Sequence, residues 1–161
     1  SGFTAHRNGD AVFSFMTTKL GFASKDEAQA IRDEYFARFH STVKALTIAE
    51  ADGRLPAGVH FEASMLSDWW ADGLDFGTYL KPCEPFRDSL RRCPLKLVAF
   101  SNAPRRYAIR VLEALQLREF FSEDCIWAVD DVMPACKPEP EAFAKVLAAI
   151  GSSAEQCVMI E

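Results

Sequence analysis

In the first eighty residues, apolar side chains recur at the three- and four-residue spacing that places them on one face of a helix. This pattern predicts helices over residues 8–20, 25–39 and 62–70. Ser24 precedes the second of them and is a predicted N-cap. The first half of the chain is therefore expected to contain helices and loops only.

After about residue 80, short apolar runs alternate with helical segments. The apolar runs, which are predicted to be strands, are residues 95–100, 125–129 and 157–160. The longer helical segments that follow the first two runs are residues 104–115 and 140–150. Strands that alternate with helices are typical of a doubly wound parallel sheet. We therefore expect an α/β fold, with a Rossmann-like core at residues 81–161 and an all-α cap domain at residues 1–80.

Both ends of the sequence suggest a piece of a longer protein. The chain begins at Ser1 rather than Met, and its last apolar run stops at Glu161 with no turn or helix after it. A buried parallel strand has this composition, and ligands bind at the loops that follow such strands. We expect the core to lack its first strand and its C-terminal part.

Composition and charge restrict the classes of partner. The 161 residues carry a formal net charge of −5, and no run of Lys and Arg exceeds two residues. These properties argue against binding to nucleic acid polymers or membrane surfaces. No signal peptide or membrane-spanning apolar run is present, and the five cysteines include no C-x-x-C pair. We predict a soluble, cytoplasmic protein with reduced cysteines; the oligomeric state stays open.

A hydroxyl and an amide side chain follow the first predicted strand. Ser101 and Asn102 come directly after it, and Pro104 suits the start of the next helix. These side chains and the positive end of a helix could together bind an anion. The alternative is that Ser101 or Asn102 only caps the helix.

Two charged residues occupy the corresponding places after the other predicted strands. Lys137 lies in a proline-rich turn, where its ammonium group could neutralise a phosphate, or where it could simply be solvated. Glu161 ends the third strand, where a carboxylate suits a hard divalent cation or is only a surface group. Because a doubly wound sheet brings these positions to one edge, we expect Ser101, Lys137 and Glu161 to converge on one phosphate-sized pocket.

The order of these segments resembles motifs two, three and four of the haloacid dehalogenase (HAD) superfamily. The three motifs are an apolar strand followed by Ser101-Asn102-Ala103, then Lys137-Pro138-Glu139-Pro140, then an apolar strand followed by Glu161. The likeness extends to the pyrimidine 5′-nucleotidase-like branch, in which a small helical cap follows motif one. The pieces that resemble this branch are residues 16–21, 35, 40–42, 79–82, 110–115 and 120–121.

The resemblance implies Mg²⁺-dependent hydrolysis of a small phosphate monoester, with nucleoside 5′-monophosphates as the first candidates. An Asp attacks the phosphorus to form an aspartyl-phosphate, which water then hydrolyses. In this scheme Ser101 and Asn102 bind the phosphoryl group, and Lys137 steadies the nucleophile and the phosphate. Glu161 would belong to the Mg²⁺ site. Thr42, together with Lys44, could face the substrate from the cap.

The chain also departs from the family pattern. No Asp-x-Asp motif occurs, and Asp130-Asp131 follows the second core strand without the turn that the motif needs. His40 stands where many relatives have Gly, which bears on the substrate contacts of the cap loop. The 161 residues alone are therefore expected to bind phosphate poorly and to hydrolyse nothing. Two alternatives stay open: a 2-haloacid dehalogenase, which needs no metal and which Glu161 disfavours, and a non-catalytic HAD-fold binding or scaffold protein.

Overall fold

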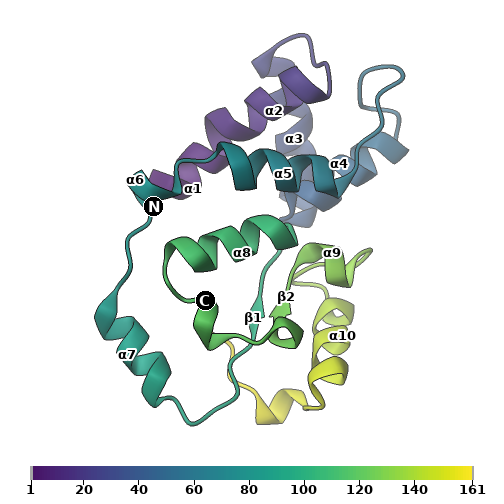
Figure 1. Ribbon diagram of the computed structural model, residues 1–161. Helices are drawn as coiled ribbons and strands as arrows, with labels where there is room; N and C mark the ends of the chain where they lie inside the picture. The colour runs from purple at the N-terminus through teal and green to yellow at the C-terminus, as the bar shows by residue number, and fades with distance from the viewer. Residues whose placement is uncertain (1, 161) are drawn as a thin grey trace.

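The computed structural model describes residues 2–160, and its first half is helical (Figure 1). The elements of this half are α1 (Gly2–His6), the π-helical turn η1 (Arg7–Ala11), α2 (Val12–Lys19), α3 (Lys25–Phe39), α4 (Thr42–Ala51), α5 (Ala63–Gly73) and α6 (Phe76–Tyr79). The expectation of helices and loops alone is confirmed for the described part of residues 1–80.

The second half contains the strands. Its elements are α7 (Glu84–Arg92), β1 (Ala99–Phe100), α8 (Arg105–Ala114), η2 (Arg118–Phe120), η3 (Glu123–Cys125), β2 (Ile126–Trp127), α9 (Val129–Val132), α10 (Pro140–Ile150) and η4 (Ala154–Gln156). Strands β1 and β2 pair in parallel, with Ala99 opposite Ile126 and Phe100 opposite Trp127. The connection from β1 through α8 to β2 is a β-α-β unit, as the alternating pattern predicted.

Local signals account for the ends of several helices. Ser24 caps α3, as predicted, because its side chain accepts a hydrogen bond from the Glu27 N–H at 3.1 Å. Pro140 begins α10, where its missing N–H leaves no helix hydrogen bond unmade. Helix α4 was not predicted, since its sequence carries few polar residues to mark one face. Ser41 caps this helix by accepting from the Lys44 N–H.

The predicted sheet is larger than the one in the structure. Both strands are shorter than predicted, and the described part of residues 157–160 forms no strand. Val158 and Ile160 are 80% and 89% exposed. A parallel strand is stabilised by hydrogen bonds to a neighbouring strand, and within residues 2–160 this segment pairs with none. The prediction of a buried third strand at residues 157–160 is therefore wrong for this structure.

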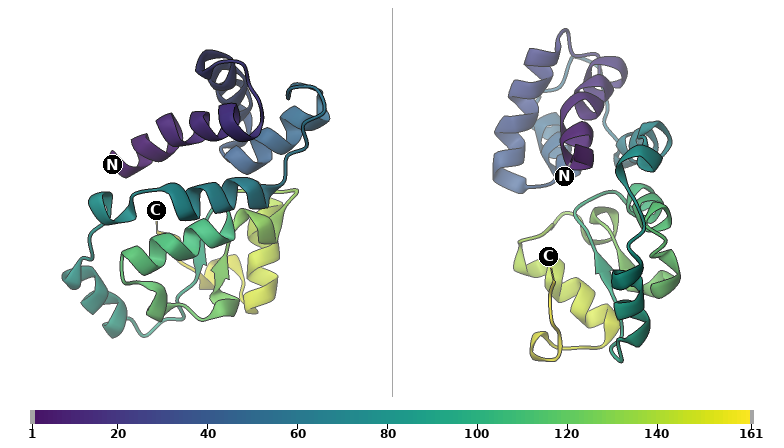
Figure 2. Two further views of the ribbon diagram at one scale, coloured as in Figure 1. Left: turned by 45° about the horizontal axis from the view of Figure 1, so that its top comes forward. Right: turned by 90° about the vertical axis from the view of Figure 1, so that its left-hand side faces the viewer.

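The main apolar cluster crosses from one half of the chain to the other. Leu66 and Trp70 of α5 belong to it, and so do Tyr107 of α8 and Val129 of α9. Helix α5 lies along α8 in two different views (Figures 1 and 2). Within the described residues, no helix combines the length and apolarity needed to cross a membrane.

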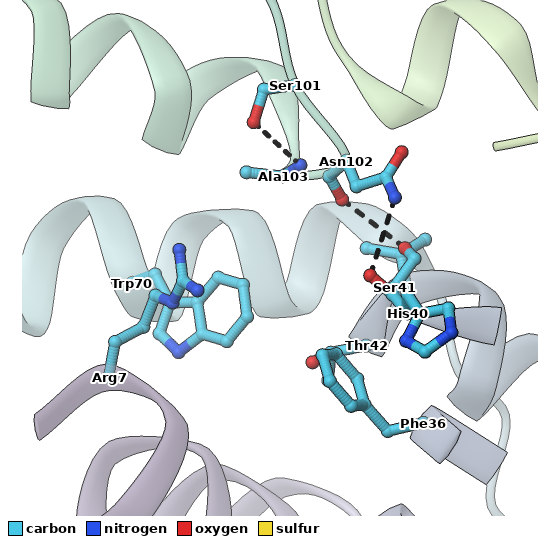
Figure 3. A pocket seen from close by; sticks show the side chains of 10 residues that line it. Arg7, Phe36, His40, Ser41, Thr42, Trp70, Ser101, Asn102 and Ala103 are labelled. Atoms are coloured by element: carbon cyan, nitrogen blue, oxygen red, sulfur yellow. Dashed lines mark hydrogen bonds between the residues drawn. The ribbon is translucent and has the colours of Figure 1, made fainter. Parts of the chain in front are cut away.

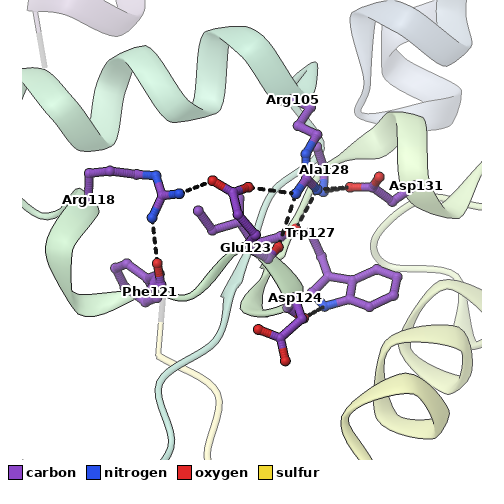
Figure 4. Close-up of polar contacts among 9 residues, drawn as sticks. Arg105, Arg118, Phe121, Glu123, Asp124, Trp127, Ala128 and Asp131 are labelled. Carbon is purple, nitrogen blue, oxygen red and sulfur yellow. Dashed lines mark hydrogen bonds and ion pairs between the residues drawn. The ribbon is translucent and has the colours of Figure 1, made fainter.

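Hydrogen bonds and an ion pair of Arg105 fix the start of α8 against β2 (Figure 4). The Arg105 guanidinium donates to the Ile126 carbonyl at 2.6 Å and pairs with Asp131 at 2.9 Å. Asp130 accepts from the Arg105 backbone N–H. The carboxylates of Asp130 and Asp131 therefore both bind the start of α8 through Arg105. A second arginine, Arg118, pairs with Glu123 beside it.

Candidate active site

Hydrogen bonds to β2 and to the start of α9 hold the loop after β1 on both sides of Asn102. The Ser101 N–H donates to the Trp127 carbonyl at 2.9 Å, and the Val129 N–H donates to the Ala103 carbonyl at 3.1 Å. The Ser101 hydroxyl oxygen accepts from the Ala103 N–H at 3.1 Å, which leaves its own proton available to donate. Pro104 occupies the N-cap position of α8 without a side-chain cap. Neither Ser101 nor Asn102 therefore caps α8, so the alternative that they serve only as helix caps does not hold.

Asn102 joins this loop to the loop that carries Lys137. Its side-chain Nδ2 donates to the Lys137 carbonyl at 2.7 Å, and its Oδ1 accepts from the Lys137 N–H at 2.8 Å. The Lys137 ammonium lies 5.4 Å from the centre of the Phe100 ring, at the end of β1. The two motif loops are thus side by side, as the parallel strand order predicts.

Two adjoining hollows carry the predicted residues. Ser101 lines a pocket of about 120 Å³, and Lys137 lines an open depression beside it. His40 and Asn102 line both hollows. Glu161, the third member of the predicted constellation, lies outside the described residues. The structure therefore brings the loops of Ser101 and Lys137 together, but the two residues line adjoining hollows and not the single pocket that was predicted. The convergence with Glu161 stays a prediction.

The connection between α3 and α4 forms the opposite wall of the site. The Ser41 hydroxyl donates to the Asn102 carbonyl at 3.3 Å, and the Asn102 side chain donates to the His40 carbonyl at 3.4 Å. His40 ends α3 with a φ of 52°, the left-handed conformation in which glycine costs least. A glycine would suit this conformation, and in this chain the His40 side chain lines the site instead.

Lys44 is used in a contact between the halves of the chain. Its ammonium lies 2.5 and 2.6 Å from the two carboxylate oxygens of Glu139, and its side chain is only 9% exposed. Glu139 also accepts from the Cys136 N–H at 2.7 Å. The Lys44 ammonium and this N–H hold the pKa of the Glu139 carboxyl below its usual range. Lys44 was expected to face the substrate. In the structure its ammonium group instead forms an ion pair with Glu139.

The pocket has one wall that the sequence did not indicate (Figure 3). Its lining residues are Arg7, Phe36, His40, Ser41, Thr42, Val43, Trp70, Ser101, Asn102 and Ala103. Thr42 lies in the lining, and its contact with a substrate stays a prediction. Arg7 and Trp70 lie across the pocket from Ser41, His40 and Asn102 (Figure 3). No local motif surrounds Arg7, so only the folded chain identifies it.

A metal ion would need a cluster of oxygen, nitrogen or sulfur ligands. Within residues 2–160, no cluster of three or more His, Cys, Asp and Glu side chains has the arrangement for a metal ion. Cys136 beside Lys137 is buried, and burial raises the pKa of its thiol, which suits a packed cysteine. Glu161, the predicted Mg²⁺ ligand, lies outside the described residues, so the predicted metal site stays a prediction.

Comparison with known families gives one match. Residues 76–161 match the haloacid dehalogenase-like hydrolase family, over just over half of the chain. The matched region contains β1, β2 and the loops of Ser101 and Lys137. No curated protein matches the chain.

Proposed function

Since this chain belongs to the haloacid dehalogenase-like hydrolases, we propose that the full-length protein hydrolyses a small phosphate monoester. The observation that carries the proposal is the pair of hydrogen bonds through which Asn102 holds the Ser101 and Lys137 loops together. This arrangement offers a hydroxyl donor and an ammonium group from neighbouring loops. Donors fixed in this way before the reaction stabilise the charge that develops on a transferring phosphoryl group.

Each residue has a proposed role in this reaction. The Ser101 hydroxyl and the Asn102 backbone bind the phosphoryl oxygens, and the Lys137 ammonium offsets their charge. Thr42 contacts the rest of the substrate from the α4 side of the pocket. The reaction proceeds through an aspartyl-phosphate, and the Asp-x-Asp pair that this step uses does not occur among the 161 residues. The proposal therefore requires an Asp-x-Asp pair outside these 161 residues.

We further propose that residues 1–80 form a helical cap over a core of residues 81–161, as in the pyrimidine 5′-nucleotidase-like branch. The contacts of Ser41 with Asn102 and of Lys44 with Glu139 support this division, because both link α4 to motif loops. Mg²⁺ is the proposed cofactor, held by Glu161 and by acids beyond the described residues. Nucleoside 5′-monophosphates are one substrate class to test among small phosphate esters.

The proposal is tested by measuring release of inorganic phosphate from a panel of phosphate esters by the full-length protein, with and without Mg²⁺. We expect Mg²⁺-dependent turnover of at least one ester. Release of halide from 2-haloacids without metal would instead indicate a dehalogenase. No hydrolysis of any ester, with no Asp-x-Asp pair in the full-length sequence, would favour a binding or scaffold protein.

Replacement of Lys137 tests its proposed role. We expect Lys137→Met to lower kcat/KM by about a hundredfold or more, because a charge that faces the phosphoryl group is lost. The methionine keeps an apolar stem beside the Phe100 ring, so the free energy of unfolding should change by less than about 0.5 kcal/mol. Lys145→Met, on the exposed side of α10, is the matched control and should retain activity. A parallel loss of stability and activity would make Lys137 a structural residue.

A further inference from the structure

Arg7 is brought to the pocket by an irregular turn. Residues 7–11 form the π-helical turn η1 between α1 and α2, and Gly9 has non-helical angles there (φ −97°, ψ −107°). The Arg7 guanidinium lies 5.5 Å from the ring centres of both Trp70 and Tyr107. Its Nη1 donates to the Tyr107 hydroxyl at 3.1 Å. Aromatic side chains from α5 and α8 therefore hold this cation in one position.

Among residues 2–160, no carboxylate neutralises the charge of Arg7. Its hydrogen bonds go to the Asn8 side chain and to the Tyr107 hydroxyl, both neutral. In the part of the chain that the structure describes, no Asp or Glu forms an ion pair with it, whereas Arg105 and Arg106 each contact carboxylates. A partly buried cation of this kind is stabilised when an anion binds beside it.

The rest of the pocket also presents donors rather than acids. The described residues that line it include no Asp or Glu, although the protein has a net charge of −5. The N-terminus of α4 borders it through Ser41, Thr42 and Val43, and the first N–H groups of a helix have no partner within the helix. The Arg7 guanidinium and the N-terminus of α4 are independent observations that favour an anion.

We infer that this pocket binds a second anionic group of the substrate, either a carboxylate or a further phosphate, through Arg7. This inference rests on the proposed function and deepens it. Lys137 lines the adjoining depression. Asn102 lines both hollows, so it lies where they meet. In this proposal the reacting phosphoryl group lies where the two hollows meet, between the Ser101 hydroxyl and the Lys137 ammonium, and the other end of the substrate extends to Arg7. The substrate class is then a small phosphate monoester that carries a second negative charge.

The experiment compares pairs of esters that differ in the second group alone. The full-length protein is assayed with 3-phosphoglycerate against glycerol 3-phosphate, and with fructose 1,6-bisphosphate against fructose 6-phosphate. UMP serves as an ester without a second anion. We expect kcat/KM to be about tenfold or more higher for the anionic member of at least one pair. The first pair reports a carboxylate as the second group, and the second pair reports a phosphate.

Replacement of Arg7 should remove this preference selectively. With Arg7→Gln, KM for the preferred anionic ester should rise about tenfold or more, while its neutral counterpart changes by less than about twofold. Arg7→Lys should restore part of the preference, because it keeps the charge but loses the planar fork. Arg110→Gln is the matched control, since Arg110 also lies over an aromatic ring but outside the pocket lining.

Distinct results would overturn the inference. Equal kcat/KM within both pairs would do so, and so would an Arg7→Gln variant that slows every ester equally, because Arg7 would then contact the reacting phosphoryl group. If no ester is hydrolysed, including p-nitrophenyl phosphate, the proposed function fails. Calorimetric binding of 3-phosphoglycerate, fructose 1,6-bisphosphate and their neutral counterparts then tests Arg7 by itself, and equal affinities within each pair contradict its role. If Arg7→Gln does not fold, Arg7→Lys should still raise KM for the preferred anionic ester several-fold.

Discussion

At the scale of single residues, Asn102 connects the candidate site. Its side chain binds both backbone groups of Lys137, and its carbonyl accepts from the Ser41 hydroxyl. One amide therefore sets the distance between the two motif loops and also meets the helical half of the chain. Asn suits this position because it offers a donor and an acceptor on one short side chain.

Asn102→Asp should separate the two loops. It replaces the Nδ2 donor by an oxygen that faces the Lys137 carbonyl at 2.7 Å, so one hydrogen bond becomes a repulsion. We expect the free energy of unfolding at neutral pH to fall by about 1–3 kcal/mol, as measured by urea denaturation.

The pH dependence supplies an internal control for this variant. Protonation returns a donor to the introduced carboxyl group, so the stability difference from the unsubstituted protein should shrink as the pH falls through the pKa of that carboxyl. A difference that is absent at neutral pH, or that grows on acidification, would contradict the geometry.

At the scale of elements, an ion pair joins α4 to the start of α10. Lys44 lies in the first turn of α4, and Glu139 is the N-cap residue of α10. The carboxylate also accepts from the Cys136 N–H, so it stiffens the Lys137 loop as well. The buried ammonium depends on this partner, whereas Glu139 itself is 38% exposed.

Glu139→Gln should weaken this contact in a pH-dependent way. The pKa of Glu139 is lowered by Lys44, so its carboxylate contributes stability above the usual Glu pKa and loses it as the pH falls through the lowered value. At neutral pH we expect a loss of about 1–2 kcal/mol, a modest value because the carboxylate is partly solvated. Urea denaturation between about pH 3 and pH 7 should show the curves of the two proteins converging in acid.

Glu141→Gln, on the exposed face of the same helix, is the control and should leave the pH dependence unchanged. Curves for Glu139→Gln that stay parallel to those of the unsubstituted protein over the whole pH range would show that the ion pair contributes nothing to stability.

At the scale of the whole molecule, the apolar cluster makes the two halves of the chain depend on each other. Trp70 of α5 and Tyr107 of α8 are both buried in it, with ring centres 5.3 Å apart. Separate domains usually meet through smaller and more polar surfaces. The shared cluster therefore favours unfolding of both halves in one step, although each carries a different kind of secondary structure.

We predict a single cooperative unfolding transition. Near-ultraviolet circular dichroism, which reports tryptophan packing, and far-ultraviolet circular dichroism should give coincident curves. Leu66→Ala, at a fully buried position of α5, should lower the free energy of unfolding by about 2–5 kcal/mol and shift both curves together. Two resolved transitions, or a shift in only one probe, would show that the halves unfold independently.

The sequence by itself determined the features that depend on neighbours along the chain. Ser24 and Pro140 set the starts of α3 and α10 through local hydrogen bonding. The adjacency of the Ser101 and Lys137 loops also followed, because parallel strands joined by a helix place the ends of both strands at one edge.

Only the tertiary structure decided the contacts between distant positions. Arg7 and Tyr107 are 100 residues apart, and Lys44 and Glu139 are 95 apart, so no local pattern could pair them. The apolar run at residues 157–160 shows the same dependence, since a strand forms only where another strand offers hydrogen bonds. Helices satisfy their own backbone groups, whereas strands, ion pairs and pockets take their partners from the fold.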